Sequence, residues 1–419
     1  MEAHNKAEML RIVTAGSVDD GKSTLIGRLL FDTKQIFIDQ LDALKEASKR
    51  RGFENIDLSL IVDGLKAERE QGITIDVAHR YFSTPKRKFI LYDTPGHMQY
   101  TRNMITGASN AHLAIILIDA RNGVMEQTKR HALILTLLQI PHIVICINKM
   151  DLVNYSRETF EKIKANFENF SSKLDFKDVS FIPISALNGD NIVNKSSNMD
   201  WFGGPTLLYT LENVYIASDY NLRDCRFPIQ YVIRPKNEAF QDFRGYAGRI
   251  ESGIFKPRDK ITVLPSGFTT KIKTIETFDG KLAEAFPPMS ATITLEDDID
   301  ISRGYMFVRE NNIPTVNQDL DLMVCWLNPV KLDTTKRYTV MHTTREVKCI
   351  VKEILYKIDI NTLHRIEKDT SVGMNEFARI KIRTSEPLFF DSYLKNKSTG
   401  SLIFIDEGTN ETVALGLIR

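Results

Sequence analysis

The residues most able to do chemistry form an octapeptide near the N-terminus, GSVDDGKS, from Gly16 to Ser23. It fits the pattern G-x-x-x-x-G-K-[ST], in which a glycine-rich loop presents backbone N–H groups to phosphate oxygens. An apolar run, LRIVTA, precedes it and a helical pattern, TLIGRLLF, follows, so the phosphates would also meet a helix N-terminus. In such loops Lys22 reaches the β- and γ-phosphates and the Ser23 hydroxyl ligates Mg²⁺. The octapeptide therefore predicts a nucleoside triphosphate as ligand.

A second motif, NKMD, indicates which base is bound. It follows the apolar run HIVICI, and open parallel sheets bind ligands at the carboxyl ends of their strands. The Asp151 carboxylate can accept hydrogen bonds from guanine N1–H and the 2-amino group, a donor pair that adenine lacks. Asn148 is expected to brace the loops, the stem of Lys149 to cover the base, and the backbone N–H of Ala186 to meet guanine O6. The predicted guanine-binding residues are Asn148, Lys149, Met150, Asp151, Ser185, Ala186 and Leu187.

Two further segments predict the parts that respond to the γ-phosphate. DTPGH follows the strand pattern KFILY, so that Asp93 can hold Mg²⁺ through water and the Gly96 N–H can meet the γ-phosphate. Upstream, EREQGITID contains Thr74, whose hydroxyl would complete the Mg²⁺ shell only while the γ-phosphate is present. A lone histidine is more often structural, but the position directly after DTPG favours His97 as the group that orients the attacking water.

These motifs define one predicted site for GTP and Mg²⁺. The predicted catalytic residues are His97 and Lys22, and the predicted Mg²⁺ ligands are Ser23, Thr74 and Asp93. The predicted phosphate-binding residues are Gly16, Ser17, Val18, Asp19, Asp20, Gly21, Lys22, Ser23, Thr24, Asp93, Thr94, Pro95, Gly96 and His97.

The elements that must position these residues follow from the hydrophobic pattern. Up to about residue 215, apolar runs alternate with amphipathic stretches, which predicts a mainly parallel sheet with helices on both faces. After Asp224 the chain changes to short β-rich runs with frequent turns, in two sets. We therefore expect an α/β P-loop GTPase domain at residues 8–215, followed by two all-β barrel domains at 225–311 and 315–419.

Composition adds weaker constraints. Lys and Arg number 55 and Asp and Glu 54, for a net charge of +1, so a basic nucleic-acid binder is not expected. The four cysteines are scattered without a C-x-x-C pair, which predicts neither a zinc site nor a redox motif and suits a reducing cytoplasm. No secretory signal and no apolar run of about 20 residues is present, so neither export nor membrane insertion is expected.

The motifs also carry a family resemblance. DTPGH, GITID and NKMD together resemble the translation GTPases of the elongation factor Tu superfamily. The longer segments GSVDDGKSTLIGRLLFDTK, LKAEREQGITIDVAHRYFST and DTPGHMQYTRNMITGAS are more similar to the large, GTPase subunit of bacterial sulfate adenylyltransferase. FPIQYVIRP, DFRGYAGRIESG and SLIFIDEGTNETVALGLI extend that likeness nearly to the end of the chain. One departure is Met98, where that family more often has an acidic residue.

The resemblance implies a GTP-hydrolysing subunit of a heterodimer or higher assembly in the cytoplasm. Its partner would be the small, catalytic subunit of sulfate adenylyltransferase, which makes adenosine 5′-phosphosulfate and pyrophosphate from ATP and sulfate. No second P-loop motif follows, so an attached adenylylsulfate kinase is not expected. Two alternatives remain: an elongation factor Tu-like translation GTPase, and a regulatory GTPase without a metabolic role that acts as a binding module. Asp20, where translation factors usually have histidine, and the C-terminal SLIFIDEGTN disfavour the first.

Overall fold

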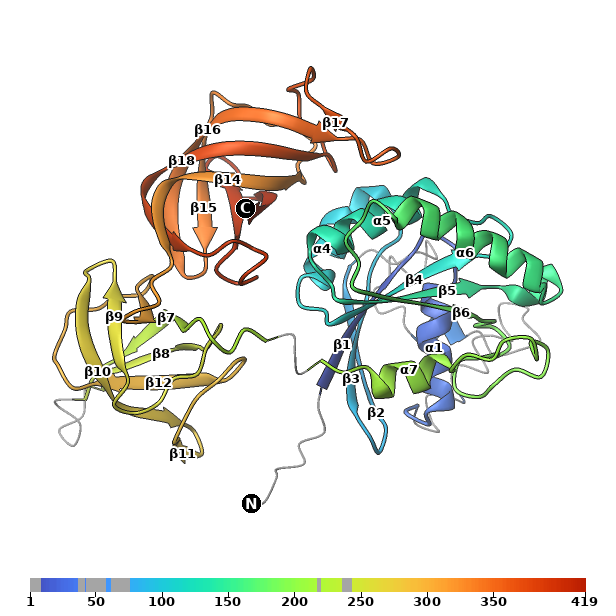
Figure 1. The fold of residues 1–419 in the computed structure, drawn as a ribbon, viewed down its shortest axis with the longest axis horizontal. Coiled ribbons are helices and arrows are strands. Elements are labelled where there is room, and N and C mark those ends of the chain that lie inside the picture. The colour runs from blue at the N-terminus through green and yellow to red at the C-terminus, as the bar shows by residue number, and fades with distance from the viewer. Residues whose placement is uncertain (1–8, 37–41, 43–57, 62–75, 217–219, 236–242) are drawn as a thin grey trace. The chain divides into compact units, whose positions relative to one another are not determined.

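The computed structural model describes residues 9–36, 42, 58–61, 76–216, 220–235 and 243–419 (Figure 1). The chain forms two compact units. One is built from residues 1–216 with 360–363, and the other from residues 217–359 with 364–419.

The first unit contains a six-stranded sheet with the strand order β2-β3-β1-β4-β5-β6. Only β2 is antiparallel to its neighbour, so the other five strands end at one edge of the sheet. The strands are β1 (Met9–Ala15), β2 (Ala78–Ser83), β3 (Lys88–Asp93), β4 (Leu113–Asp119), β5 (His142–Asn148) and β6 (Asp178–Pro183). The predicted phosphate and guanine motifs follow β1, β3, β5 and β6, so strand polarity brings them to the same edge.

Helices cover this sheet on both faces (Figure 1). Apolar residues of α1 and α7, such as Leu25 and Leu211, pack in one core cluster with Ile12 and Ile115 of the sheet. The helices are α1 (Lys22–Asp32), α4 (Thr101–Ala108), α5 (Glu126–Leu137), α6 (Arg157–Ser171) and α7 (Leu207–Asn213), with 3₁₀ turns η1 (Leu58–Ile61), η2 (Met98–Tyr100) and η3 (Met150–Val153). The residues of β4 are buried along its whole length, as expected of a strand covered on both sides.

The second unit begins with a seven-stranded sheet in the order β11-β10-β12-β8-β7-β13-β9, in which β9 also pairs with β10. Its core contains Phe227, Phe255 and Phe307, and the ring of Phe227 contacts the rings of the other two. The strands are β7 (Arg226–Ile233), β8 (Gly245–Arg249), β9 (Lys260–Leu264), β10 (Phe268–Thr277), β11 (Gly280–Lys281), β12 (Ser290–Leu295) and β13 (Met306–Arg309).

The last sheet is a closed six-stranded barrel with one added strand. Its order is β15-β19-β20-β14-β18-β16-β17, and the pairing of β15 with β16 closes it. The strands are β14 (Thr315–Trp326), β15 (Arg337–His342), β16 (Arg345–Ile358), β17 (Arg365–Ile366), β18 (Phe377–Phe390), β19 (Ser401–Asp406) and β20 (Thr412–Ile418). The predicted class, a mainly parallel α/β GTPase domain followed by β domains, is thereby confirmed.

A buried ion pair joins the two sheets of the second unit. Arg226 is 0% exposed, and its Nε and Nη2 atoms donate to the two carboxylate oxygens of Asp391 at 2.7 and 2.9 Å. Its Nη1 donates to Cys225 O, Asn312 O and Asn312 Oδ1 at 2.7–2.8 Å. Burial raises the pKa of Asp391, but the bonds from Arg226 outweigh it, and the pKa lies below its ordinary value. This pair connects β7, in the seven-stranded sheet that begins the second unit, to Asp391, the residue after β18 in the last sheet.

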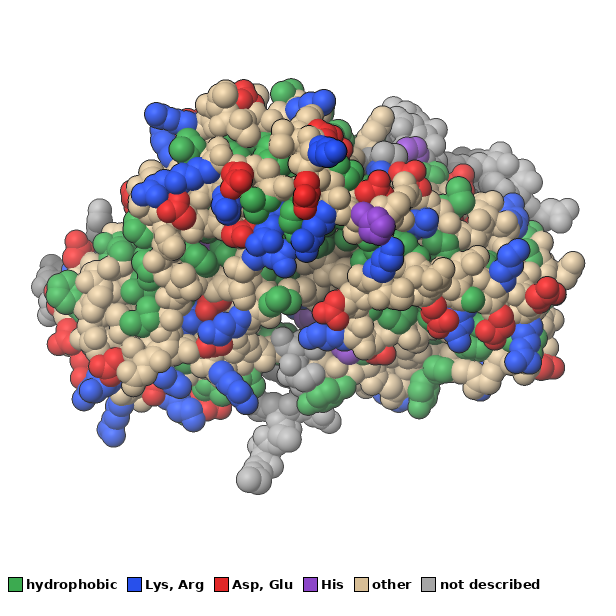
Figure 2. Space-filling model, turned by 45° about the horizontal axis from the view of Figure 1, so that its top comes forward, with side chains coloured by type: hydrophobic (Ala, Val, Ile, Leu, Met, Phe, Trp, Pro, Cys, Tyr) green, Lys and Arg blue, Asp and Glu red, His purple; other side chains and the backbone are tan. Residues whose placement is uncertain are grey.

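The remaining features concern the thiols and the surface. All four cysteines are free and buried. Over the face in Figure 2, Lys and Arg side chains lie among Asp and Glu side chains, in keeping with the net charge of +1. Among the described helices, none combines the length and the apolar character that crossing a bilayer requires.

Candidate functional site: phosphate and guanine loops

The predicted phosphate loop connects β1 to α1. Gly21, directly before α1, has a φ of 93°, in the left-handed region that glycine tolerates best. A Cβ built at this position would lie 2.5 Å from Asn148 Nδ2. Gly21 therefore serves both the turn of the loop and the close approach of the guanine motif.

Lys22 is nearly buried at 7% exposure. Its ammonium group donates to Gly16 O at 3.0 Å and to Ser17 O at 2.7 Å. Burial lowers the pKa of Lys22, and the charges of Asp93 and Asp20 oppose that shift. A Cβ built on Gly96 would lie 2.6 Å from Lys22 Nζ, so the DTPGH loop passes directly beside this ammonium group.

Asp20 places a second ionisable group inside the same loop. It is 5% exposed, and its Oδ2 accepts a hydrogen bond from Ser17 N–H at 2.5 Å. Burial raises the pKa of Asp20 to about 6, although the nearby charge of Lys22 opposes the shift. Burial therefore disfavours the charged form of both groups in this loop, the ammonium of Lys22 and the carboxylate of Asp20. Within the loop, Asp19 is exposed, whereas Ser17 and Val18 are half-buried.

The residues after β3 surround the loop from the sheet side. Asp93 is fully buried, and its Oδ1 accepts from Thr14 Oγ1 at 3.3 Å. Thr94 is also fully buried and donates its hydroxyl to Thr14 O. Pro95 and Gly96 are buried as well, whereas Ser23 and Thr24, in the first turn of α1, are half-buried.

His97 comes next and is half-buried. Its Nδ1 is inaccessible and has no hydrogen-bond partner within the described residues. Its ring stands edge-on to Tyr100, with the centroids 6.4 Å apart. Met98 is the first residue of η2. Thr74, the remaining predicted Mg²⁺ ligand, lies outside the described residues.

Asn148 links the phosphate loop to the second guanine loop. It is 1% exposed, its Nδ2 donates to Asp20 O at 2.7 Å, and its Oδ1 accepts from Ala186 N–H at 2.9 Å. The sequence assigns that Ala186 N–H to guanine O6, so O6 must share or displace the bond to Asn148. Ser185 and Met150 are fully buried, and the backbone N–H of Met150 donates to Ile184 O at 3.2 Å.

Lys149 and Asp151 complete the NKMD motif. The Lys149 ammonium lies 3.0 Å from Asp119 Oδ2 and also donates to Asp19 O. Burial raises the pKa of Asp119, but hydrogen bonds from Arg121 and Lys149 outweigh it and bring the pKa to about 2. Because these contacts anchor the ammonium group, they also fix the path of the aliphatic part of the Lys149 side chain. Asp151 is half-buried in η3.

Sequence reasoning missed His131, which supports the phosphate loop from behind. This α5 residue is 1% exposed, and its Nδ1 accepts the Gly16 N–H at 3.1 Å. Burial lowers the pKa of His131 to about 3, so the ring is neutral and carries its proton on Nε2. Nε2 lies 3.3 Å from Gln127 Nε2, where a flipped amide would present an oxygen acceptor instead. No local motif marks this role.

Arg28 of α1 and Asp119 at the end of β4 were also missed. Arg28 donates to the backbone carbonyls of Ala186 and Leu187, and Asp119 anchors Lys149. A strand-end aspartate was the available signal for Asp119. For Arg28 the sequence offers only an arginine on a helix, which is usually solvated.

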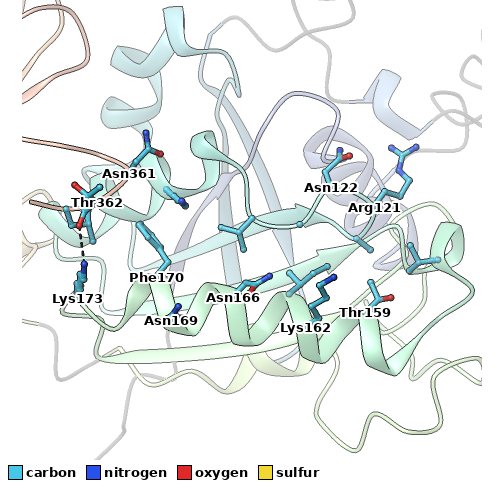
Figure 3. A pocket seen from close by; sticks show the side chains of 17 residues that line it. Arg121, Asn122, Thr159, Lys162, Asn166, Asn169, Phe170, Lys173, Asn361 and Thr362 are labelled. Carbon is cyan, nitrogen blue, oxygen red and sulfur yellow. Dashed lines mark hydrogen bonds between the residues drawn. The ribbon is translucent and has the colours of Figure 1, made fainter.

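A cavity of about 820 Å³ lies apart from the phosphate loop, beside α6 and the loop after β4 (Figure 3). Lys162, Asn166 and Lys173 line it from α6 and the turn that follows, and Arg121 and Asn122 from the loop. Arg121 connects it to the guanine side, because its guanidinium pairs with Asp119 at 2.6 Å. The cavity includes none of the predicted phosphate-binding residues.

Two known protein families match this chain, and the nucleotide motifs all lie in the first matching region. The GTP-binding domain of elongation factor Tu matches residues 7–218. The C-terminal domain-like family of GTP-eEF1A matches residues 319–419.

Individual proteins match over almost the whole chain. A sulfate adenylyltransferase subunit 1 from Bacteroides fragilis is 52% identical over 420 residues, covering 100% of this chain and 87% of that protein. A bifunctional CysN/CysC enzyme from Mycobacterium tuberculosis is 53% identical over 411 residues, covering 98% of this chain and 67% of that protein. The crystal structure of the GTPase-like domain of Ski7 from S. cerevisiae, bound to GDP and inorganic phosphate, aligns with a TM-score of 0.54 at 17% identity. That alignment covers 99% of this chain and 97% of that one and shows a shared fold alone.

Proposed function

Since this chain belongs to the family of sulfate adenylyltransferase subunit 1, the GTP-binding subunit that acts in sulfate activation, we propose that its GTP hydrolysis drives the transfer of an adenylyl group to sulfate on a separate small catalytic subunit. In that transfer a sulfate oxygen attacks the α-phosphorus of ATP and pyrophosphate leaves. The phosphate–sulfate anhydride formed is highly activated, so the step needs a coupled source of free energy. The approach of Gly96 to Lys22 is the observation that carries this proposal, because it joins phosphate binding to a loop able to respond to the γ-phosphate.

The phosphate chemistry rests on Lys22. Two backbone carbonyls accept from its ammonium group, which has three protons to donate. The remaining donor capacity and the buried positive charge fit the β- and γ-phosphates of GTP. Because Lys22 is nearly buried, this charge should stabilise the transferring phosphoryl group more than an exposed lysine would.

For hydrolysis we assign water positioning to His97. Its buried Nδ1 has no partner within the described residues, so the hydrogen-bonding capacity of the ring is not used up by the chain described. Phosphoryl transfer depends mainly on position and electrostatics, so His97 need not remove a proton to be effective. The Gly96 N–H beside it is assigned to the γ-phosphate.

For the metal we assign Ser23 and Asp93 as protein ligands of Mg²⁺, the latter through water. A hydroxyl and a carboxylate are the oxygen ligands that Mg²⁺ prefers, and Mg²⁺ fills the rest of its shell with water and phosphate oxygens. The oxygen chemistry of the Ser23 hydroxyl and the Asp93 carboxylate fits this sparse arrangement. When bound, the ion would neutralise charge that develops on the phosphates.

For the base we assign guanine N1–H and the 2-amino group to Asp151, and guanine O6 to the loop that contains Ala186. Asn148 supports this assignment, since it holds the Ala186 loop and the phosphate loop at fixed separation. The four free cysteines are consistent with a cytoplasmic location, which we also propose.

The decisive experiment is to purify the chain with its small subunit and to follow pyrophosphate release from ATP and sulfate, with and without GTP. We expect GTP to stimulate sulfate-dependent release and a non-hydrolysable analogue not to do so. In the same assembly His97→Ala should slow single-turnover GTP hydrolysis by about 10²-fold, within the range for lost positioning groups. Its GTP affinity should remain close to that of the unmodified protein.

Two results would argue against the proposal. GTP hydrolysis indifferent to the partner, ATP and sulfate would leave a GTPase without coupling. Stoichiometric copurification with tRNA would instead favour the translation-factor alternative.

A further inference from the structure

We propose that Arg28 is a positioning residue for base specificity, which aims the backbone of the second guanine loop at guanine O6. The inference rests on the guanine site proposed above and extends it to a side chain of α1 outside every nucleotide-binding motif. Arg28 acts through the loop, not by touching the base.

The contacts of Arg28 are directed at main-chain oxygens. Its Nε donates to Ala186 O at 3.2 Å, and its Nη2 donates to Leu187 O. Its Nη1 lies 3.6 Å from Asp32 Oδ1, one turn later on α1. The side chain is only 18% exposed, and its contact with Ala186 O is partly buried, whereas the contact with Leu187 O is exposed. A guanidinium group presents its donors in a fixed fork, which sets the direction of both carbonyls.

The geometry of the peptide group connects this contact of Arg28 to recognition of the base. The carbonyl of Ala186 and the N–H of Leu187 belong to one planar trans peptide and point in opposite directions. Because Arg28 draws the Ala186 oxygen toward α1, the Leu187 N–H is directed away from α1. This N–H has no recorded acceptor within the described part of the chain.

The neighbouring N–H lies on the side of the nucleotide loops. Ala186 N–H donates to Asn148 Oδ1 at 2.9 Å, and the same Asn148 holds Asp20 O. Successive N–H groups of this kind form a concavity that favours a negative or carbonyl oxygen. Guanine carries an oxygen at position 6, whereas adenine carries an amino donor that would oppose both N–H groups. A cation on the far side of the peptide also polarises it and strengthens its N–H as a donor.

The loop does not depend on Arg28 to exist. Gly189 N–H donates to Ser185 O at 2.8 Å, and Ser196 Oγ donates to Asp190 Oδ1 at 2.6 Å. The hydroxyl of Tyr155 also donates to Asp190. These bonds close the turn from within, so the loss of Arg28 should free the two carbonyls while the chain still folds.

The test compares nucleotides that differ at one position of the base, titrated calorimetrically into the full-length chain. In 6-thio-GTP a weakly accepting sulfur replaces O6, and ITP lacks the 2-amino group. The unmodified protein should bind GTP more tightly than either analogue. In Arg28→Met the affinity for GTP should fall by up to about tenfold, as expected for the loss of one neutral N–H to O6 hydrogen bond that Arg28 directs. The affinity for 6-thio-GTP should fall much less, so the GTP to 6-thio-GTP ratio shrinks.

Three further results belong to the same experiment. The ratio of GTP to ITP affinity should not change in Arg28→Met, because Asp151 reads the 2-amino group, whereas Asp151→Asn should collapse it. Arg28→Lys should restore part of the GTP to 6-thio-GTP ratio. Asp32→Asn, which leaves the bonds to the carbonyls in place, is the matched control and should keep both ratios.

The outcomes separate the possible failures. If Arg28→Met weakens GTP and 6-thio-GTP by the same factor, Arg28 only stabilises the fold and the inference is overturned. If the unmodified protein binds ATP as tightly as GTP, the guanine site itself is wrong, and the inference falls with it. Thermal unfolding of each variant shows whether a lost affinity reflects lost structure.

Discussion

Two buried cations, Lys22 in the phosphate loop and Arg226 between the β sheets, meet the same physical difficulty in different ways. Removing a charge from water is costly unless nearby groups replace its hydration. Each of the three side-chain nitrogens of Arg226 donates to an acceptor of the chain, and Nε and Nη2 reach the two oxygens of Asp391. Among the residues that the structure describes, Lys22 has two carbonyls as hydrogen-bond partners, and burial lowers its pKa. We infer that Arg226, whose nitrogens are paired within the chain, is a structural cation. Lys22 keeps hydrogen-bonding capacity that a bound ligand can use.

The largest expected effect comes from removing the counter-charge of the structural cation, Arg226. Asp391→Asn should lower the free energy of unfolding by about 3–5 kcal/mol, because it leaves Arg226 buried without its counter-charge. Chemical denaturation of the full chain, with the β-sheet signal followed by circular dichroism, measures this. The double replacement Arg226→Met with Asp391→Leu should recover most of the loss.

The half-exposed pair of Lys381 and Glu353, 3.1 Å apart, provides the control for that prediction. Its removal by Lys381→Ala should cost less than about 1 kcal/mol, as for other surface ion pairs. Equal losses for Asp391→Asn and Lys381→Ala would show that burial does not distinguish them.

The next effect concerns the ligand-dependent cation. Lys22→Met should reduce the kcat/KM for GTP by about 10²–10³-fold, the usual loss of one buried electrostatic donor. The same change should also stabilise the nucleotide-free protein, since it removes a charge whose pKa burial lowers. Single-turnover kinetics and thermal unfolding without nucleotide measure the two effects. A variant that loses both activity and stability would place Lys22 with Arg226 as a structural cation.

The smallest effect is a dependence of stability on pH. Burial raises the pKa of Asp20 from 3.8 to about 6, so the folded protein binds this proton more tightly than the unfolded chain. The resulting stabilisation is complete below pH 3.8 and is lost as the pH rises through 6. Asp20→Asn should therefore stabilise the nucleotide-free protein by about 3 kcal/mol at pH 7.5, with a gain that shrinks toward zero near pH 4.

Denaturation curves at several pH values test this prediction. Asp19→Asn changes the neighbouring, exposed carboxylate and should shift stability by less than about 0.5 kcal/mol throughout. A gain for Asp20→Asn that stays constant between pH 4 and 7.5 would contradict the assigned cause.

The sequence predicted those parts of the site that are local in the chain. The apolar run before Gly16 forms β1, the pattern after it forms α1, and the run before NKMD forms β5. The polarity of parallel strands then placed these motifs at one edge without further information. The prediction of β domains after the GTPase domain likewise followed from short, turn-punctuated runs and is confirmed.

The parts that escaped prediction depend on approaches between distant segments. Arg28 contacts a carbonyl 158 residues away, and His131 accepts from an N–H 115 residues away. Arg226 pairs with Asp391 across 165 residues. A helical arginine or histidine has the same local signature whether it is solvated or holds a loop, so only packing distinguishes the two. The position of the Lys149 ammonium group depends less on packing between distant segments, because its partner Asp119 is itself held in place by strand pairing.

The burial of all four cysteines has a practical consequence for spectroscopy. Thiol-specific dyes react with the thiolate, and burial raises the pKa of Cys146, Cys225 and Cys349. The native cysteines should therefore react little with fluorescent or spin labels. One cysteine introduced at Leu394, which is 81% exposed, and another at Tyr209, which is 57% exposed, would carry labels on the two compact units. Their separation could then be followed through a nucleotide cycle without first removing any native thiol.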